Sequence, residues 1–142
     1  TADQFSPPTL TAKGTTDMAS GVNQALDLLQ RRKRQYASNG VPYYRPWAFL
    51  ITDGEISDPQ QVAQRVSEEE SRRAVTFFAV GVEGAREDSL RSISVRPHKM
   101  LSGVKFKELF LWLSASLQGV SRAKPGEMVA LDNNTGTWEM VG

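Results

Sequence analysis

The sequence predicts a single α/β domain in which helices cover both faces of a mostly parallel β-sheet. Two short apolar runs, residues 47–52 and 75–82, have the composition of strands that are buried on both faces. Segments with helical spacing precede, separate and follow these runs, and this alternation favours parallel strands joined by right-handed crossovers. The length of 142 residues fits one domain with its own hydrophobic core.

The first part of the chain is expected to be a leading loop followed by a long helix. Residues 1–16 form the loop, because Pro7-Pro8 prevents a helix there. Helical spacing begins near Met18, and Asn39-Gly40 ends it because both residues tolerate a left-handed backbone. One mostly apolar stripe runs along this helix, formed by Val22, Ala25, Leu26, Leu29, Lys33 and Tyr36.

A second helix is expected between the two apolar runs, from Pro59, which suits a first helical turn, to Ala74. Val62 and Val66 can face the core from this helix. Its charged residues are expected to remain in water: Glu68, Glu69, Glu70, Arg72 and Arg73.

The rest of the chain predicts a short helix over residues 86–95, a short strand over 98–101 and a last long helix over 105–121. The last helix carries an apolar face made of Phe106, Leu109, Phe110, Leu113, Leu117 and Val120. The α/β core therefore spans residues 17–121, and residues 122–142 form a tail that could add a small strand.

Composition excludes several classes of protein. The sequence contains no cysteine, so it has neither disulfides nor thiolate metal ligands, and it has no apolar run of the roughly 20 residues that span a bilayer. We expect a cytoplasmic protein that does not bind membranes. The net charge of +1 gives no general attraction for nucleic acid, and the basic run of residues 31–34 sits in the C-terminal half of a helix, where cations favour the helix dipole.

Oxygen-bearing side chains are predicted to meet at the carboxyl ends of the strands, where open parallel sheets bind ligands. Asp53 directly follows the first apolar run, and Gly14-Thr15-Thr16-Asp17 directly precedes the first helix. Hydroxyl and carboxylate oxygens suit Mg²⁺ or a similar ion. Structural roles also remain open, since Asp53 could bond within its own turn and Thr16 could cap the helix.

These segments resemble a known family. Gly14-Thr15-Thr16-Asp17-Met18 and Phe49-Leu50-Ile51-Thr52-Asp53-Gly54 resemble the second and third loops of the metal-ion-dependent adhesion site (MIDAS) in von Willebrand factor A (VWA) domains. More narrowly, the sequence looks like the bacterial tellurite-resistance TerY-like group. The stretches that carry this second resemblance are residues 5–10, 43–47, 77–85 and 109–117.

The resemblance implies a Rossmann-like three-layer sandwich with a metal-assisted binding site. By it, Thr16 is the metal ligand of the second loop and Asp53 is the carboxylate of the third, holding Mg²⁺ or Mn²⁺ directly or through water. A carboxylate of a partner protein commonly completes the shell of the ion in this family. Asp17, Glu55 and Asp58 are expected on the rim of the site, where the partner binds.

The sequence departs from the family in lacking the first loop, an Asp-x-Ser-x-Ser at the end of the central strand, together with the first strands of the sheet. Residues 1–142 are therefore expected to be a partial VWA domain. One carboxylate and one hydroxyl are too few ligands for a tight Mg²⁺ site, so the complete parent domain is expected to hold the ion and this chain alone to be empty. The open edge of strand 47–52 is expected to receive the absent part or to pair with a second copy of the chain.

The resemblance implies a protein–protein interaction module and not an enzyme. Its setting would be a bacterial stress response such as tellurite resistance, with a Ser/Thr kinase or a PP2C-type phosphatase as partner. One alternative is a metal-dependent hydrolase or phosphoesterase that uses Glu55 or Asp58 near Asp53. The other alternative is a metal-free structural fragment that forms a homo-oligomer through its open sheet edge.

Overall fold

A computed structural model describes Ser6, Thr9 and residues 17–54, 56, 58–101, 103 and 105–124. Nearly all of the expected leading loop, and the tail from residue 125 with its expected small strand, lie outside the described residues. Helices and strands follow one another in the predicted order. They are α1 (Met18–Ser38), β1 (Trp47–Thr52), α2 (Pro59–Ser71), β2 (Thr76–Gly81), α3 (Glu87–Ile93), β3 (Lys99–Met100) and α4 (Phe106–Arg122).

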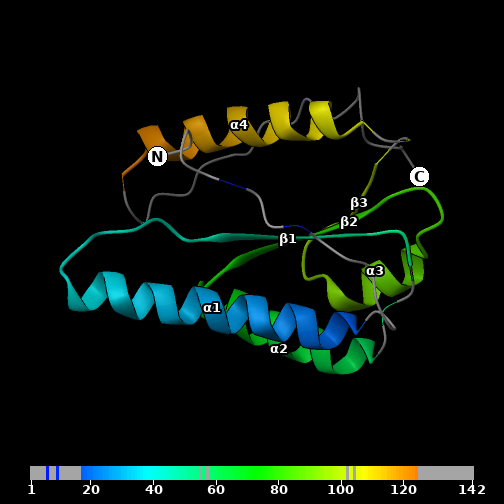
Figure 1. Cartoon of the computed structure of the whole chain (residues 1–142), viewed down its shortest axis with the longest axis horizontal. Coiled ribbons are helices and arrows are strands. Elements are labelled where there is room, and N and C mark those ends of the chain that lie inside the picture. Colours follow the sequence, from blue (N-terminus) through cyan, green and yellow to red (C-terminus); the bar gives the residue numbers. More distant parts are fainter. Residues whose placement is uncertain are drawn as a thin grey trace.

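The described strands form one parallel sheet in the order β1-β2-β3. Trp47 of β1 lies opposite Thr76 of β2, and Thr52 lies opposite Gly81, so β1 and β2 end at the same edge of the sheet. Helices cover both faces, with α1, α2 and α3 on one side and α4 on the other (Figure 1). The predicted α/β sandwich with a parallel sheet is therefore confirmed.

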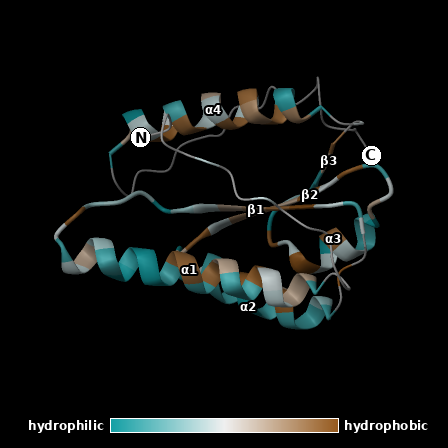
Figure 2. Cartoon of the chain, in the orientation of Figure 1, coloured by the Kyte–Doolittle hydropathy of each residue, from teal (hydrophilic) through white to brown (hydrophobic). Residues whose placement is uncertain are grey.

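The two faces of β2 build two separate hydrophobic clusters, because successive side chains of a strand point to opposite faces. Phe77 and Ala79 pack with buried residues of α1, α2 and α3, and Phe78 and Val80 pack with Leu109 and Trp112 of α4. Figure 2 shows hydrophobic residues on the strands and hydrophilic residues over the outer surfaces of α1 and α2. All six residues of β2 are buried, as the sequence predicts for this strand.

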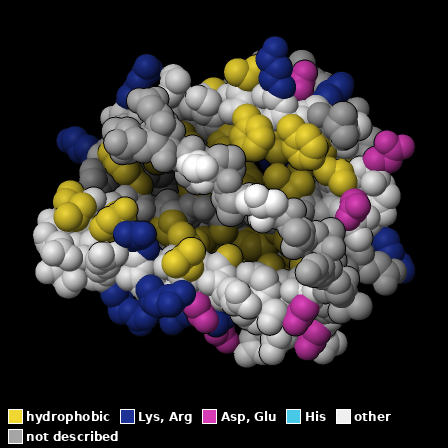
Figure 3. Space-filling view, in the orientation of Figure 1, with side chains coloured by type: hydrophobic (Ala, Val, Ile, Leu, Met, Phe, Trp, Pro, Cys, Tyr) yellow, Lys and Arg dark blue, Asp and Glu magenta, His cyan; other side chains and the backbone are white. Residues whose placement is uncertain are grey.

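β1 is less buried than its composition predicts, because it is the edge strand of the described sheet. Residues 47–50 are half-buried and Ile51 is exposed, so only Thr52 reaches full burial. Figure 3 shows hydrophobic side chains in a hollow between the layer of α4 and the layer of α1, where β1 runs in Figure 1. A strand with free edge hydrogen-bonding groups and apolar side chains can accept another strand.

The helix ends follow the local chemistry of the sequence, with one change. α1 ends where expected, and only Gly40, with φ of 65°, is left-handed, whereas Asn39 is not. α2 stops at Ser71, three residues before the predicted end at Ala74, because Arg73 turns to a φ of 53°.

Two predictions about exposure are wrong. Glu69 and Glu70 are buried and do not remain in water: Glu69 binds Arg65 and Arg72, and Glu70 binds two other arginines. The buried face of α4 is also rotated from the predicted one. It consists of Leu109, Trp112 and Ser116, whereas three residues of the predicted face are exposed: Phe106, Phe110 and Leu117.

Candidate functional site

The carboxyl ends of β1 and β2 and the N-terminal ends of α1 and α2 lie at the same edge of the molecule, on the right in Figure 1. We call this region the strand-end edge and define its described part by Asp17, Thr52, Asp53, Gly54 and Asp58. Asp17, Asp53 and Asp58 are site residues that the sequence and its family resemblance predict, and the fold brings them to one edge because parallel strands joined by helical crossovers bring strand ends and helix starts together.

Asp53 has a free carboxylate at the strand-end edge. The turn after β1 is stabilised by its neighbour, since the buried hydroxyl of Thr52 accepts a hydrogen bond from the N–H of Gly54 at 3.1 Å. Asp53 itself is exposed and makes no hydrogen bond or ion pair within the described part of the chain. Among the described residues, nothing in its own turn occupies this carboxylate, so it is available to a ligand.

Asp17 and Asp58 have local structural roles in addition to their position at the edge. Asp17 caps α1 by accepting a hydrogen bond from the N–H of Ser20 at 3.0 Å, and Asp58 caps α2 by accepting one from the N–H of Gln61 at 3.4 Å. A carboxylate at a helix N-terminus satisfies a free N–H and interacts favourably with the helix dipole. Their place on a binding rim stays a prediction.

The other two predicted site residues, Thr16 and Glu55, lie outside the described residues. Among the residues that the structure describes, no group of three or more His, Cys, Asp or Glu side chains could hold a metal ion. One free carboxylate provides fewer oxygen ligands than Mg²⁺ or Mn²⁺ needs. The described side chains by themselves do not make a complete metal site.

Two glycines shape the loop beside Asp53. Gly84 has a φ of +95°, and a Cβ added there would lie 3.6 Å from the backbone oxygen of Asp53, so the loop after β2 passes close to the end of β1. Gly81 is required for packing: a Cβ there would lie 2.6 Å from Leu90 and from Met100. A glycine inside an apolar strand is typical of such a close approach.

His98 directly precedes β3, which is shorter than the predicted strand 98–101, and its Nε2 lies 3.6 Å from a carboxylate oxygen of Glu87. It contacts none of the residues that define the strand-end edge through any hydrogen bond or ion pair found in the described structure. No described helix is long and apolar enough to cross a membrane.

Comparison with known proteins identifies the family. A search of curated proteins and a search of solved structures each gave no match. Residues 7–110, most of the chain, match the family described as von Willebrand factor type A domain. The match includes both predicted metal-binding loops as well as α1, β1, α2 and β2. With its parallel sheet between layers of helices, the chain belongs to the von Willebrand factor type A domain family.

Proposed function

We propose that this VWA domain is a protein-binding module that holds its partner at the strand-end edge through a divalent ion. The observation that carries the proposal is the carboxylate of Asp53, which is exposed at the carboxyl end of β1 and has no partner within the described residues. VWA domains commonly mediate metal-dependent protein interactions, and an exposed carboxylate at the end of a parallel strand supports Asp53 as a ligand of such an ion.

The proposed ligands are all hard oxygen donors. Asp53 supplies a carboxylate and Thr16 a hydroxyl, and a carboxylate of the partner protein completes the shell of Mg²⁺ or Mn²⁺. The ion supplies positive charge between two acidic surfaces that would otherwise repel each other. Asp17 and Asp58 lie at the same edge, where they would contact the partner beside the ion.

A further strand beside β1 would complete both the sheet and the metal site. Half-burial of β1, in contrast to the full burial of β2, supports a further strand on the side of β1 that no described strand occupies. We propose that this strand carries the remaining metal-binding loop of the family and belongs to the intact parent domain.

The proposed setting is a bacterial stress response of the tellurite-resistance kind. The support is the likeness of residues 5–10, 43–47, 77–85 and 109–117 to TerY-like proteins. A Ser/Thr kinase or a PP2C-type phosphatase is the proposed partner.

Calorimetric titration of Mg²⁺ and of Mn²⁺ tests the metal site. We expect binding by a version of the protein extended through the first loop, and loss of that binding in Asp53→Ala. Glu68→Ala is the matched control, since it removes an exposed carboxylate from the far half of α2. Failure of the extended protein to bind either ion would overturn the metal-dependent proposal.

Each of two alternative functions is tested by a separate experiment. Hydrolysis of a generic phosphoester that is lost in Asp53→Ala would favour a metal-dependent hydrolase, in which Glu55 or Asp58 would act as the base. A stable dimer of this chain in EDTA, seen by light scattering and abolished by Ala48→Pro in the edge strand, would favour self-association through β1.

A further inference from the structure

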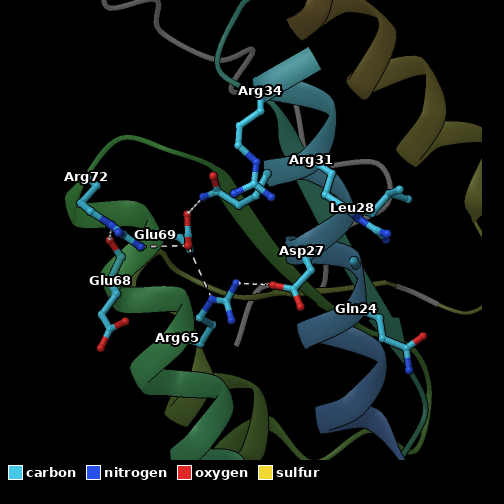
Figure 4. A pocket seen from close by; sticks show the side chains of 11 residues that line it. Gln24, Asp27, Leu28, Arg31, Arg34, Arg65, Glu68, Glu69 and Arg72 are labelled. Atoms are coloured by element: carbon cyan, nitrogen blue, oxygen red, sulfur yellow. Dashed lines mark hydrogen bonds and ion pairs between the residues drawn. The ribbon is translucent and has the colours of Figure 1, made fainter. Parts of the chain in front are cut away.

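An open groove of about 870 Å³ lies between α1 and α2 (Figure 4). It is a different surface from the strand-end edge, because it extends along the two helices toward the C-terminal half of α1. Its charged lining on α1 consists of Asp27, Arg31 and Arg34. On α2 and its C-terminal end the charged lining residues are Arg65, Glu68, Glu69 and Arg72.

Both arginines of the α2 wall of the groove, Arg65 and Arg72, are paired with carboxylates. Glu69 is only 3% exposed, and its carboxylate binds Arg72 at 2.9 Å and Arg65 at 3.5 Å. Arg65 also binds Asp27 across the groove at 2.7 Å, and this hydrogen bond raises the pKa of Arg65. The ion pair between Arg65 and Asp27 holds α1 against α2, and the charges of both arginines are neutralised by these carboxylates.

The α1 wall carries positive charge without a partner. Arg31 and Arg34 are three residues apart and therefore lie on the same side of the helix. Both are exposed, and neither makes a hydrogen bond or ion pair within the described structure. The two residues between them are engaged elsewhere: Arg32 donates to Gln35 at 3.0 Å, and Lys33 donates to the backbone oxygen of Ala74 at 3.1 Å.

We propose that this groove is a second docking surface, which takes an acidic segment of a partner protein. Carboxylates of that segment would pair with Arg31 and Arg34, since the planar guanidinium group matches a carboxylate in two parallel hydrogen bonds. This inference goes beyond the proposed function, because it concerns another surface and requires no metal ion.

Charge complementarity favours an acidic polypeptide over nucleic acid as the occupant. The groove is also lined by three carboxylates, those of Asp27, Glu68 and Glu69. A nucleic-acid backbone carries a negative charge at every phosphate, so some phosphates would lie near these carboxylates and be repelled by them. A polypeptide can instead place its acidic side chains only beside Arg31 and Arg34. The net charge of the whole chain, +1, adds little attraction for a polyanion.

Fluorescence anisotropy with a labelled oligo-glutamate peptide, in EDTA, tests the proposal. We expect the double variant Arg31→Gln/Arg34→Gln to bind the peptide roughly tenfold more weakly than the unchanged protein, the effect of losing two exposed ion pairs. The matched control is Arg32→Gln/Arg122→Gln, which removes two exposed positive charges at positions that do not line the groove. Its affinity should stay within about twofold of the unchanged protein.

Three results would overturn the proposal. They are no binding of the peptide, equal weakening in both double variants, and tighter binding of a single-stranded oligothymidylate that is lost in Arg31→Gln/Arg34→Gln. The last result would assign the groove to nucleic acid. Because EDTA removes divalent ions, the outcome is independent of the metal site at the strand-end edge. Unchanged thermal unfolding of both double variants would show that neither change acts through folding.

Discussion

The carboxylate of Glu70 accepts a hydrogen bond from the backbone N–H of Phe77 at 2.8 Å, so the last turn of α2 is bonded to β2 through a side chain. The same carboxylate binds Arg45, which precedes β1, and Arg96, which precedes β3 and lies at 3.0 Å. Arg45 also donates to the backbone oxygen of Val75. One buried acid therefore joins the segments that begin all three described strands.

Replacing Glu70 by Gln should lower the free energy of unfolding by about 3 kcal/mol, because two arginines and a backbone N–H lose a charged acceptor in a buried place. Urea unfolding followed by circular dichroism measures this loss. Glu68→Gln, at an exposed position of the same helix, should change the value by less than about 0.5 kcal/mol. Similar losses in the two variants would show that the contacts of Glu70 add no more to the free energy of unfolding than an exposed carboxylate does.

Gly81→Ala should destabilise the protein by about 1–3 kcal/mol, since the added methyl group would overlap Leu90 and Met100. Gly21→Ala is the matched control, because a Cβ at Gly21 meets nothing within 4 Å and alanine favours the interior of α1. Thermal unfolding should move in opposite directions for the two variants. A Gly81→Ala protein as stable as the unchanged one would contradict the packing of β2 against α3 described here.

Asp17→Ala should cost about 1 kcal/mol of stability by removing the cap of α1, whereas Asp17→Asn should cost little, since asparagine also caps helices well. Urea unfolding measures both. Asp53→Ala, by comparison, should leave stability within about 0.5 kcal/mol of the unchanged protein, because its side chain has no partner within the described residues. A large loss in Asp53→Ala would point to a structural role for this carboxylate.

Trp112→Ala should destabilise the protein by about 3–5 kcal/mol, because the indole ring is 4% exposed and packs edge-on against Phe78. Phe110→Ala, two residues earlier on the same helix, removes a ring that is 57% exposed and should have a far smaller effect. Chemical unfolding of both proteins checks the orientation of α4. The reverse order of effects would mean that the face predicted from the sequence packs on the sheet.

The local sequence was sufficient to predict the order of the helices and strands and the position of Asp53 in the fold. The bounds of β1 were predicted residue for residue, since an apolar run followed by Asp-Gly has few other interpretations. The position of Asp53 followed from the same strand end. The sequence left open whether Asp53 would bond within its own turn. In the described structure the hydroxyl of Thr52 makes the bond in this turn, and Asp53 has no partner among the described residues.

Interactions between distant parts of the chain could not be predicted in the same way. Glu70 was expected in water because nothing nearby marks it as buried; its partners Arg45 and Arg96 lie 25 and 26 residues away. The face of α4 was misplaced because its apolar residues extend around more than one side of the helix, so the pattern did not determine which side packs on the sheet.

The unequal layers of helices have a consequence for local unfolding. One face of the sheet is held by α1, α2 and α3 together, and α1 and α2 are further joined by the ion pair between Asp27 and Arg65. On the other face, the described residues provide one helix, α4, whose buried side consists of Leu109, Trp112 and Ser116. Amide hydrogen exchange should therefore release the α4 protons first and those of β2 last, with α4 opening as a unit while the rest of the domain stays folded.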